Sequence, residues 1–210
     1  MKILTIDTST NCIHIILQEG KEPIYDISID TENKHAELLL IVIENVLRRN
    51  ALTYSSIDCF SIINGPGSFI GLKVSIAFIK ALKCAMGKTR IILNDLFQVL
   101  SFQQEYDFIL LETNNGSLYL RNKEQYNCYL QKDECYNLLD RDSRIITNYR
   151  GNVDFLKSSN IVSRQVDSAV IVALNHFKYI NGQFNEGDIR PVYLRDPQVN
   201  TRNEQKLHNK

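Results

Sequence analysis

A glycine-rich turn between an apolar strand and an apolar helix contains the residue types in this chain that are best suited to binding. The turn reads Gly65-Pro66-Gly67-Ser68-Phe69 and leads into a helical pattern over residues 69–86. Glycine adopts backbone angles closed to other residues, proline fixes its own φ, and Ser68 can cap the first free amides of the helix. Because such amides attract anions, we predict a structural turn, or else an anion site, at Asp7, Gly65, Gly67 and Ser68. The structural turn is favoured, since the glycine spacing is neither that of a P-loop nor that of a dinucleotide fold.

Groups that could catalyse a reaction are sparse in the sequence. Asp7 ends the first apolar run, where an aspartate can position a metal-bound water, but a closing turn explains it adequately. Ser68 does not lie in a Gly-x-Ser-x-Gly elbow. The helical His-x-x-x-His pair of a zinc site is missing, because leucine stands four residues after His35. We therefore predict no catalytic residue, no metal site and no cofactor.

The composition favours a globular cytoplasmic protein. Hydrophobic residues make up 44% of the 210 residues, which is enough for a substantial core. No run approaches the roughly 20 apolar residues of a membrane span, and Asp7 interrupts the first apolar run, so neither a membrane segment nor a signal peptide is expected. Five cysteines without a Cys-x-x-Cys pair favour a reducing compartment. Since 24 basic residues balance 24 acidic ones, any RNA contact is expected to be shared with a partner.

The hydrophobic pattern predicts two related α/β lobes, the second abbreviated. In the first lobe we expect three strands, a helix, a strand and a helix, at residues 2–7, 12–18, 24–29, 35–49, 57–63 and 69–86. A similar order is expected at residues 108–112, 117–121, 126–130, 133–139, 144–147 and 167–179. This order resembles the repeated half of the actin-like ATPase (ASKHA, ribonuclease H-like) fold. The predicted division is a lobe at 1–103, a lobe at 104–186, and a tail at 187–210 that packs partly on the first lobe.

Four ordered motifs resemble those of the TsaB (YeaZ) family, which is related to TsaD and the glycoprotease-like proteins. The first strand and its turn read Ile3-Leu4-Thr5-Ile6-Asp7-Thr8-Ser9, and the first helix starts His35-Ala36-Glu37. The glycine-rich turn continues into Gly71-Leu72-Lys73, and Pro191-Val192-Tyr193-Leu194-Arg195 stands near the end of the sequence. The chain departs from the family pattern at Ile70, at Lys73 in place of arginine, and at Glu112-Thr113-Asn114 in place of Asp-Ala-Arg.

Both long helices of the first lobe are apolar on more than one flank. On the first helix one stripe, which contains Leu39 and Ile43, is expected to face the sheet, and on the second helix a stripe that contains Phe78 is expected to do so. A second apolar flank needs a second surface, either inside the monomer or on another subunit. We predict a partner interface at Leu38, Ile41, Val42, Lys73, Ile76, Ala77 and Lys80. A charge at Val42 or Ala77 is then expected to prevent pairing and leave the monomer folded.

The resemblance implies a non-catalytic scaffold subunit of the bacterial machinery that makes N6-threonylcarbamoyladenosine at position 37 of tRNA. It implies that the two helices pair with a TsaD-like enzyme, that the chain is a homodimer when alone, and that a TsaE-like ATPase docks on the complex. Contact with tRNA is expected to be indirect. The alternatives are a stand-alone actin-like ATPase or kinase and, with less support, a metallopeptidase.

Overall fold

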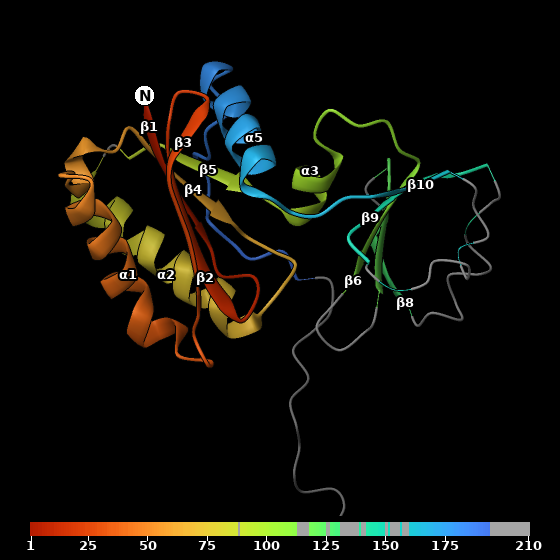
Figure 1. Ribbon diagram of the computed structural model, residues 1–210, viewed down its shortest axis with the longest axis horizontal. Helices are drawn as coiled ribbons and strands as arrows, with labels where there is room; N and C mark the ends of the chain where they lie inside the picture. Colours follow the sequence, from red (N-terminus) through yellow and green to blue (C-terminus); the bar gives the residue numbers. More distant parts are fainter. Residues whose placement is uncertain are drawn as a thin grey trace, which may run out of the picture.

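Two five-stranded sheets, each with helices or loops around it, form the two lobes of the protein (Figure 1). The computed structural model describes residues 1–87, 89–112, 118–124, 127–130 (backbone only), 139, 142–149, 151, 156 and 160–193. The motif residues 113–117, the expected helix at 133–139 apart from Leu139, and residues 194–210 lie outside this range.

The first sheet has the strand order β3-β2-β1-β4-β5. Its strands are β1 (Lys2–Asp7), β2 (Cys12–Glu19), β3 (Glu22–Asp30), β4 (Cys59–Ile63) and β5 (Ile91–Asn94). The three consecutive strands β1, β2 and β3 pair antiparallel, whereas β4 and β5 continue the sheet in parallel with β1. Every residue of β4 is buried, as expected for a central strand with helices on both faces.

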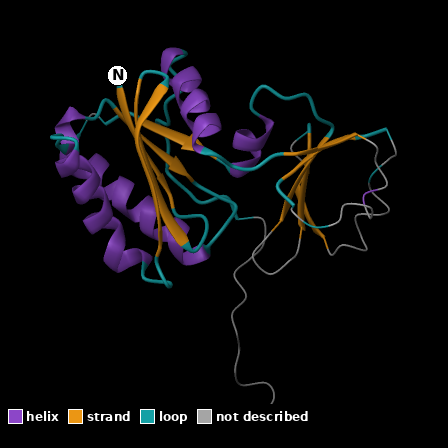
Figure 2. Ribbon diagram, in the orientation of Figure 1, coloured by secondary structure: helices purple, strands orange, loops and turns teal. Residues whose placement is uncertain are grey.

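Helices cover both faces of the first sheet (Figure 2). The helices α1 (His35–Arg49) and α2 (Phe69–Met86) pack on one face, and α5 (Ser168–Ile180) packs on the other. The short helix α3 (Leu96–Ser101) lies beside α5 and also contacts the second sheet. A short 3-10 turn, η1 (Tyr54–Ser56), precedes β4.

The second sheet repeats the strand order of the first, read from its opposite edge as β10-β9-β6-β7-β8. Its strands are β6 (Phe108–Glu112), β7 (Leu118–Asn122), β8 (Asn127–Leu130), β9 (Arg144–Thr147) and β10 (Asn160–Ser163). Here too the first three strands pair antiparallel and the last two continue in parallel. The repeat confirms the predicted two-lobed α/β fold of actin-like topology.

Four short elements were not expected from the sequence, namely η1, β5, α3 and β10. The division into lobes stays a prediction, but α5, which that division assigns to the second lobe, packs on the first sheet. A buried polar cluster fixes it there: the Asn175 amide donates to Thr5 Oγ1 at 2.8 Å and to Gln18 Oε1 at 3.1 Å. Its oxygen accepts from Ser61 Oγ and Asn94 Nδ2, each at 2.8 Å. Since all of these side chains are fully buried, a shifted helix would leave several polar groups unpaired.

Candidate functional site in the cleft between the lobes

The glycine-rich turn joins the end of β4 to α2 and is held by backbone hydrogen bonds. The Ser68 amide donates to the Ser9 carbonyl at 2.7 Å, and Ser68 Oγ accepts from the Gly71 amide at 3.2 Å. Asp7 Oδ1 accepts from the Ser9 amide at 2.8 Å, so the aspartate closes its own turn. These contacts hold the loop after β1 against the start of α2. Of the four residues predicted for the turn or anion site, Gly67 and Ser68 are accessible at this junction, whereas Asp7 and Gly65 are buried.

The three glycines at this turn serve two steric needs. Gly65 has a φ of +122°, which side chains rarely tolerate. At Gly67, a Cβ would overlap the Ser9 carbonyl oxygen, and at Gly71 a Cβ would overlap the Thr8 carbonyl oxygen. The sequence therefore predicted the unusual backbone correctly at Gly65, whereas Gly67 and Gly71 are needed for close approach.

A cleft of about 320 Å³ opens between this turn and the second lobe. The first lobe contributes the turn after β1, the glycine-rich turn and the first residue of α3, and the second lobe contributes the ends of β6 and β9 and part of β7. The lining residues are Ser9, Thr10, Pro66, Gly67, Ser68, Leu96, Leu111, Glu112, Tyr119 and Asn148. A cleft of this size can hold a small molecule.

Several polar groups in the cleft lining, or in the helix turn that follows Ser68, have no hydrogen-bond partner among the described residues. Ser9 is only 4% exposed and its hydroxyl is unpaired. The amides of Phe69 and Ile70, in the first turn of α2, have no acceptor within the described chain. Glu112 uses its backbone amide to bind Asn148 Oδ1 at 2.8 Å, but no hydrogen bond or ion pair reaches its carboxylate from the described residues. Ser9 was quoted from the sequence only as part of a family motif, because nothing in a linear pattern tells a buried unpaired hydroxyl from a solvated one.

The residues predicted for a partner interface are divided between the surface and the core. Ile41 is 54% exposed, and Lys73, Ala77 and Lys80 are also exposed. Val42 and Ile76 are each only 6% exposed and belong to the core, so the expectation that they lie on an open flank is wrong. Leu38 is half-buried against the same core.

The orientation of α2 differs from the expected one for a simple reason. Its apolar residues surround the helix, and periodicity alone could not tell which stripe faces the sheet. The stripe of Leu72, Ile76 and Ile79 is buried against the sheet, while Phe78 is half-buried and its ring lies 6.3 Å from that of Tyr54. Lys80 forms an ion pair with Asp188 at 3.0 Å, so the segment after α5 is tied to α2.

The start of α2 and the middle of α1 expose a group of apolar side chains that the sequence analysis identified only in part. Ile70 is 60% exposed, and the Phe69 ring lies 5.3 Å from that of Tyr193, with Lys73 Nζ 3.8 Å above it. We call this surface the helix patch; it comprises Leu40, Ile41, Phe69, Ile70 and Ala77. Both helices begin beside the same turn, because His35 Nε2 bonds the Thr10 carbonyl and Ser68 bonds the Ser9 carbonyl.

The other chemically suggestive residues do not form a catalytic arrangement. His14 Nε2 lies 2.7 Å from Asp26 Oδ1 and 3.3 Å from Ser168 Oγ, so both partners meet the same ring nitrogen. A relay of the serine hydrolase type needs one partner on each nitrogen. Burial raises the pKa of the Cys59 thiol to about 12, which keeps it protonated. Within the described part of the chain, no group of three His, Cys, Asp or Glu residues is placed to hold a metal.

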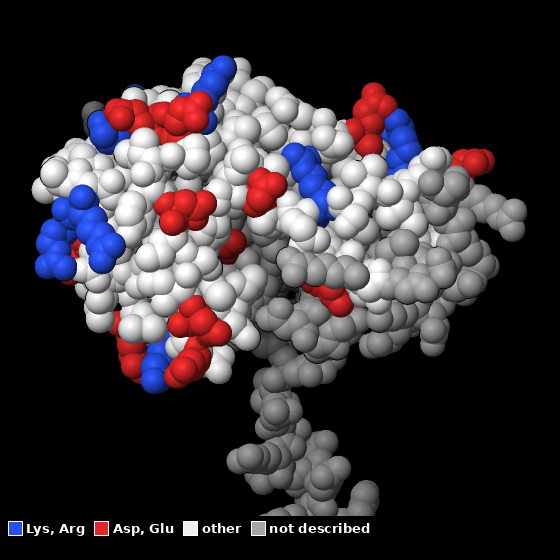
Figure 3. Space-filling view, in the orientation of Figure 1, with Lys and Arg blue, Asp and Glu red and all other residues white. Residues whose placement is uncertain are grey.

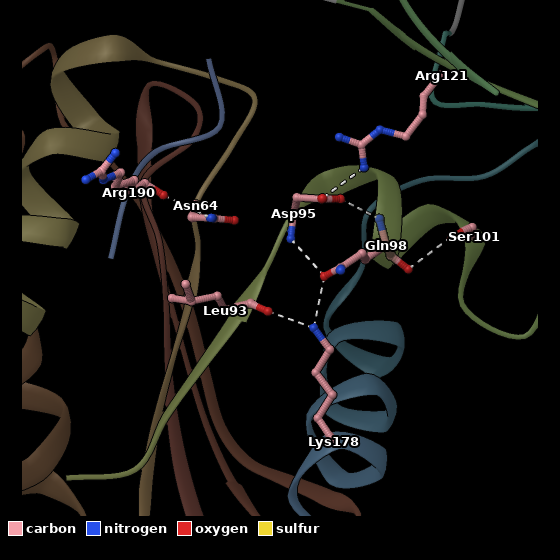
Figure 4. A network of polar contacts seen from close by, with 8 residues as sticks. All are labelled: Asn64, Leu93, Asp95, Gln98, Ser101, Arg121, Lys178 and Arg190. Atoms are coloured by element: carbon pink, nitrogen blue, oxygen red, sulfur yellow. Dashed lines mark hydrogen bonds and ion pairs between the residues drawn. The ribbon is translucent and has the colours of Figure 1, made fainter. Parts of the chain in front are cut away.

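A polar network joins the two lobes beside the cleft (Figure 4). Arg121 on β7 forms an ion pair with Asp95 at 2.9 Å, and its guanidinium lies 3.8 Å from the centre of the Phe97 ring. Asp95 also caps α3 by accepting from the Gln98 amide at 2.7 Å. From α5, Lys178 Nζ donates to the Leu93 carbonyl at 2.7 Å and to Gln98 Oε1 at 2.9 Å. Burial lowers the pKa of Lys178 to about 8, although nearby Asp95 opposes the shift.

The charged side chains of the face seen in Figure 3 are scattered: some form small groups of mixed sign near its edges, and others lie singly between them. This distribution agrees with the balance of 24 basic and 24 acidic residues in the sequence.

Among the described residues, no helix is long and apolar enough to cross a membrane.

Fold and cleft together define a two-lobed α/β protein of actin-like topology. The model of the family described as "TsaD: tRNA N6-adenosine threonylcarbamoyltransferase" matches residues 29–145, more than half of the chain. The chain therefore belongs to the TsaB/TsaD family, as its motifs predicted.

Individual relatives differ in how much of their length is matched. A protein of Mycoplasma genitalium described as uncharacterized protein MG208 is 25% identical over 200 residues, covering 92% of this chain and 95% of that protein. The tRNA threonylcarbamoyladenosine biosynthesis protein TsaB of Buchnera aphidicola (from Baizongia pistaciae) is 29% identical over 91 residues, 43% of this chain and 40% of that protein. The match thus spans only about two fifths of the curated TsaB relative. The crystal structure of YeaZ from Pseudomonas aeruginosa has a TM-score of 0.69 at 17% identity, covering 92% of this chain and 99% of that one, which shows a shared fold.

Proposed function

We propose that this chain is a non-catalytic scaffold subunit of the bacterial complex that makes N6-threonylcarbamoyladenosine at position 37 of tRNA. In this role it binds a TsaD-like enzyme and holds it in an active arrangement. The family assignment and the TsaB-named relatives support the pathway, and the helix patch is the observation that carries the scaffold role.

The helix patch is suited to pairing with another helical surface. Leu40 and Ile41 on α1 and Ile70 on α2 are large apolar side chains exposed on the outer side of a helical layer. Exposed apolar side chains that gather on one surface are typical of protein interfaces. Lys73 and Lys80 border them and give the patch a partly charged rim.

The remaining partners follow from this arrangement as parts of the same proposal. When no TsaD-like protein is present, the same patch pairs two copies of the chain into a homodimer. A TsaE-like ATPase binds the assembled complex, and tRNA is held chiefly by the enzyme subunit. The complex acts in the cytoplasm, where tRNA is modified.

Co-purification with the TsaD-like protein of the same genome tests the proposal. The wild-type chain is expected to form a stable complex, and the double variant Ile41→Glu/Ile70→Glu is expected to bind at least about a hundredfold more weakly, because two carboxylates would be buried without partners. The matched control is Ile180→Glu, an equally exposed isoleucine on the opposite face of the first sheet, which should bind like the wild type.

The same purified proteins separate a scaffold from an enzyme. Transfer of the threonylcarbamoyl group to tRNA should require the TsaD-like protein and should be stimulated by this chain. ATP turnover or transfer by this chain alone, or normal binding by the double variant, would contradict the proposal.

A further inference from the structure

We propose that the tail of this chain, residues 194–210, binds back onto the helix patch and onto the carboxylates beside it on α1. The tail then acts as an autoinhibitory segment, and a partner that uses the patch must displace it. This regulatory role rests on the proposed function, because the patch is the surface proposed for a TsaD-like protein. Three features carry the inference: where the last described residues lie, which charges flank the patch, and the composition of the tail.

The last described residues hold the chain at the rim of the patch. The Val192 amide donates to the Asn64 carbonyl at 2.7 Å, directly before the glycine-rich turn. The ring of the next residue, Tyr193, lies 5.3 Å from the ring of Phe69, which belongs to the patch. Further back, Ile189 is only 2% exposed in the core that α1 and α2 cover. The tail is therefore tethered beside the patch, which gives it a high effective concentration there.

The outer face of α1 carries apolar side chains between two carboxylates. Four residues with the spacing i, i+3, i+4 and i+7 share this face, namely Glu37, Leu40, Ile41 and Glu44. All four side chains are exposed. A segment that binds here must cover apolar surface and supply positive charge at both ends of it.

The two lysines at the border of the patch already have partners on their own side of it. Lys73 Nζ lies 3.8 Å above the Phe69 ring, and Lys80 forms an ion pair with Asp188 at 3.0 Å. Both belong to α2. The α1 side of the patch is consequently acidic, so it attracts a basic segment.

The tail matches this surface in charge and in apolar content. Its four basic residues outnumber its two acidic ones, namely Arg195, Arg202, Lys206 and Lys210 against Asp196 and Glu204. Three aliphatic residues are interspersed, namely Leu194, Val199 and Leu207. Basic groups of the tail can pair with the two glutamates of α1, and its aliphatic groups can cover the exposed isoleucines of the patch.

The tail is also long enough to reach the whole surface. The helices α1 and α2 lie side by side (Figure 1), and packed helices have axes about 8–10 Å apart. From Glu37 to Glu44 the helix rises by about 10 Å. Eight extended residues span about 26 Å, so fewer than half of the seventeen residues at 194–210 need to lie on the patch.

Zero-length cross-linking of the full chain with a carbodiimide tests the contact. This reagent joins an amine to a carboxylate that touches it, so we expect bonds from a tail lysine to Glu37 or Glu44. An equal mixture of isotope-labelled and unlabelled chains, analysed by mass spectrometry, distinguishes bonds within one chain from bonds between two copies. Glu22, exposed on β3, is the internal control and should not be joined to the tail.

Reversing the charge of the tail tests the same contact by a second measurement. The full-length variant replaces the three basic residues after Asp196 by glutamate, as Arg202→Glu/Lys206→Glu/Lys210→Glu. We expect the amide NMR signals of Ile41 and Ile70 to shift relative to the wild type, because the covering segment leaves them. The signal of Ile180, on the opposite face of the first sheet, should stay unchanged. The matched control is Lys21→Glu, at the exposed turn between β2 and β3, which should shift none of these signals.

The regulatory consequence is a competition that calorimetry can measure. Because the wild-type tail occupies the patch within its own chain, the triple variant should bind a TsaD-like protein about tenfold more tightly than the wild type does. Lys21→Glu should bind like the wild type.

Several outcomes would overturn the inference. These are cross-links to Glu37 or Glu44 only between two copies, no such cross-link within a chain, unchanged NMR signals in the triple variant, and equal binding of the TsaD-like protein by the triple variant and the wild type. If the TsaD-like protein binds neither chain while the cross-links form within a chain, the proposed function fails and the tail contact stands. If it binds both chains equally and the cross-links are missing, the tail contact fails and the proposed function stands.

Discussion

At Gly71, α2 passes so close to the loop after β1 that a Cβ atom would overlap the Thr8 carbonyl oxygen. Thr8 Oγ1 donates to the Gly71 carbonyl at 2.8 Å from the same loop, so the contact cannot open without losing a buried hydrogen bond. We expect Gly71→Ala to destabilise the fold by about 2–3 kcal/mol, as overpacking against fixed backbone does. Urea denaturation measures this change.

The matched control for this substitution is Gly187→Ala, where a new Cβ would meet no atom within 4 Å and φ is not in the left-handed region. It should change the free energy of unfolding by less than about 0.5 kcal/mol. Equal effects at the two positions would show that the loop after β1 moves aside at little cost.

Residue types alone predicted the glycine-rich turn, but they did not predict which polar atoms near it lack a hydrogen-bond partner. Glycine, proline and a capping serine in sequence define a strand-to-helix corner, because few other residues adopt those backbone angles. Which atoms remain unpaired beside that corner depends on loops that are distant in sequence, such as the end of β6 at Glu112. The cleft therefore could not be predicted from the turn itself.

At the scale of elements, two neighbouring residues of α1 have opposite surroundings. Val42 is 6% exposed and lies in the core, whereas Ile41 beside it is 54% exposed. Val42→Glu should unfold the chain or lower its melting temperature by more than about 10 °C, because it buries an unpaired carboxylate. Ile41→Glu should leave the melting temperature nearly unchanged. Thermal melts followed by circular dichroism measure both variants. Equal melting temperatures for the two would contradict the burial of Val42.

Long elements were predictable and short ones were not. Residues 35–49 and 69–86 show helical periodicity over several turns, so α1 and α2 were expected with their observed bounds. Strands β5 and β10 have four residues each and α3 has six, too few for a pattern to stand out. The sheet-facing stripe of α2 was misassigned because this helix is apolar on several sides, whereas α1 has one dominant buried stripe.

The contact between α5 and β5 should respond to pH through Lys178. Its pKa is lowered to about 8 by burial, whereas an unfolded lysine titrates near 10.5, so the folded state binds fewer protons between these values. Stability linked to this group must therefore rise as pH increases through that window. The free energy of unfolding of wild type relative to Lys178→Met is expected to increase from pH 8 to pH 10.

Denaturant titrations at pH 7, 8, 9 and 10 follow this difference. Lys21→Met, at an exposed turn between β2 and β3, is the control and should give a difference that does not vary with pH. A constant difference for Lys178→Met as well would mean that this ammonium group is not desolvated in the folded protein.

At the scale of the whole molecule, the packing of one lobe against the other depends on contacts between elements that are far apart in the sequence. Arg121 belongs to the second sheet and Asp95 to the N-terminus of α3, and each side chain is nearly buried in their ion pair. Removing Arg121 leaves the nearly buried Asp95 carboxylate without its ion-pair partner, so Arg121→Met should cost about 3 kcal/mol. Asp95→Asn should cost less, because asparagine still caps α3.

A double-mutant cycle separates this ion pair from general packing. If the pair couples the lobes, the combined variant Arg121→Met/Asp95→Asn should be more stable than the sum of the single effects predicts, by at least about 1 kcal/mol. Amide exchange should then accelerate in α3 and β7 of the single Arg121→Met variant while α1 and α2, on the far face of the first sheet, keep their protection. Additive effects on stability, together with unchanged amide exchange, would contradict this coupling. The apolar contacts of α3 with β6 and β9 would then hold the lobes together, and the ion pair would contribute little.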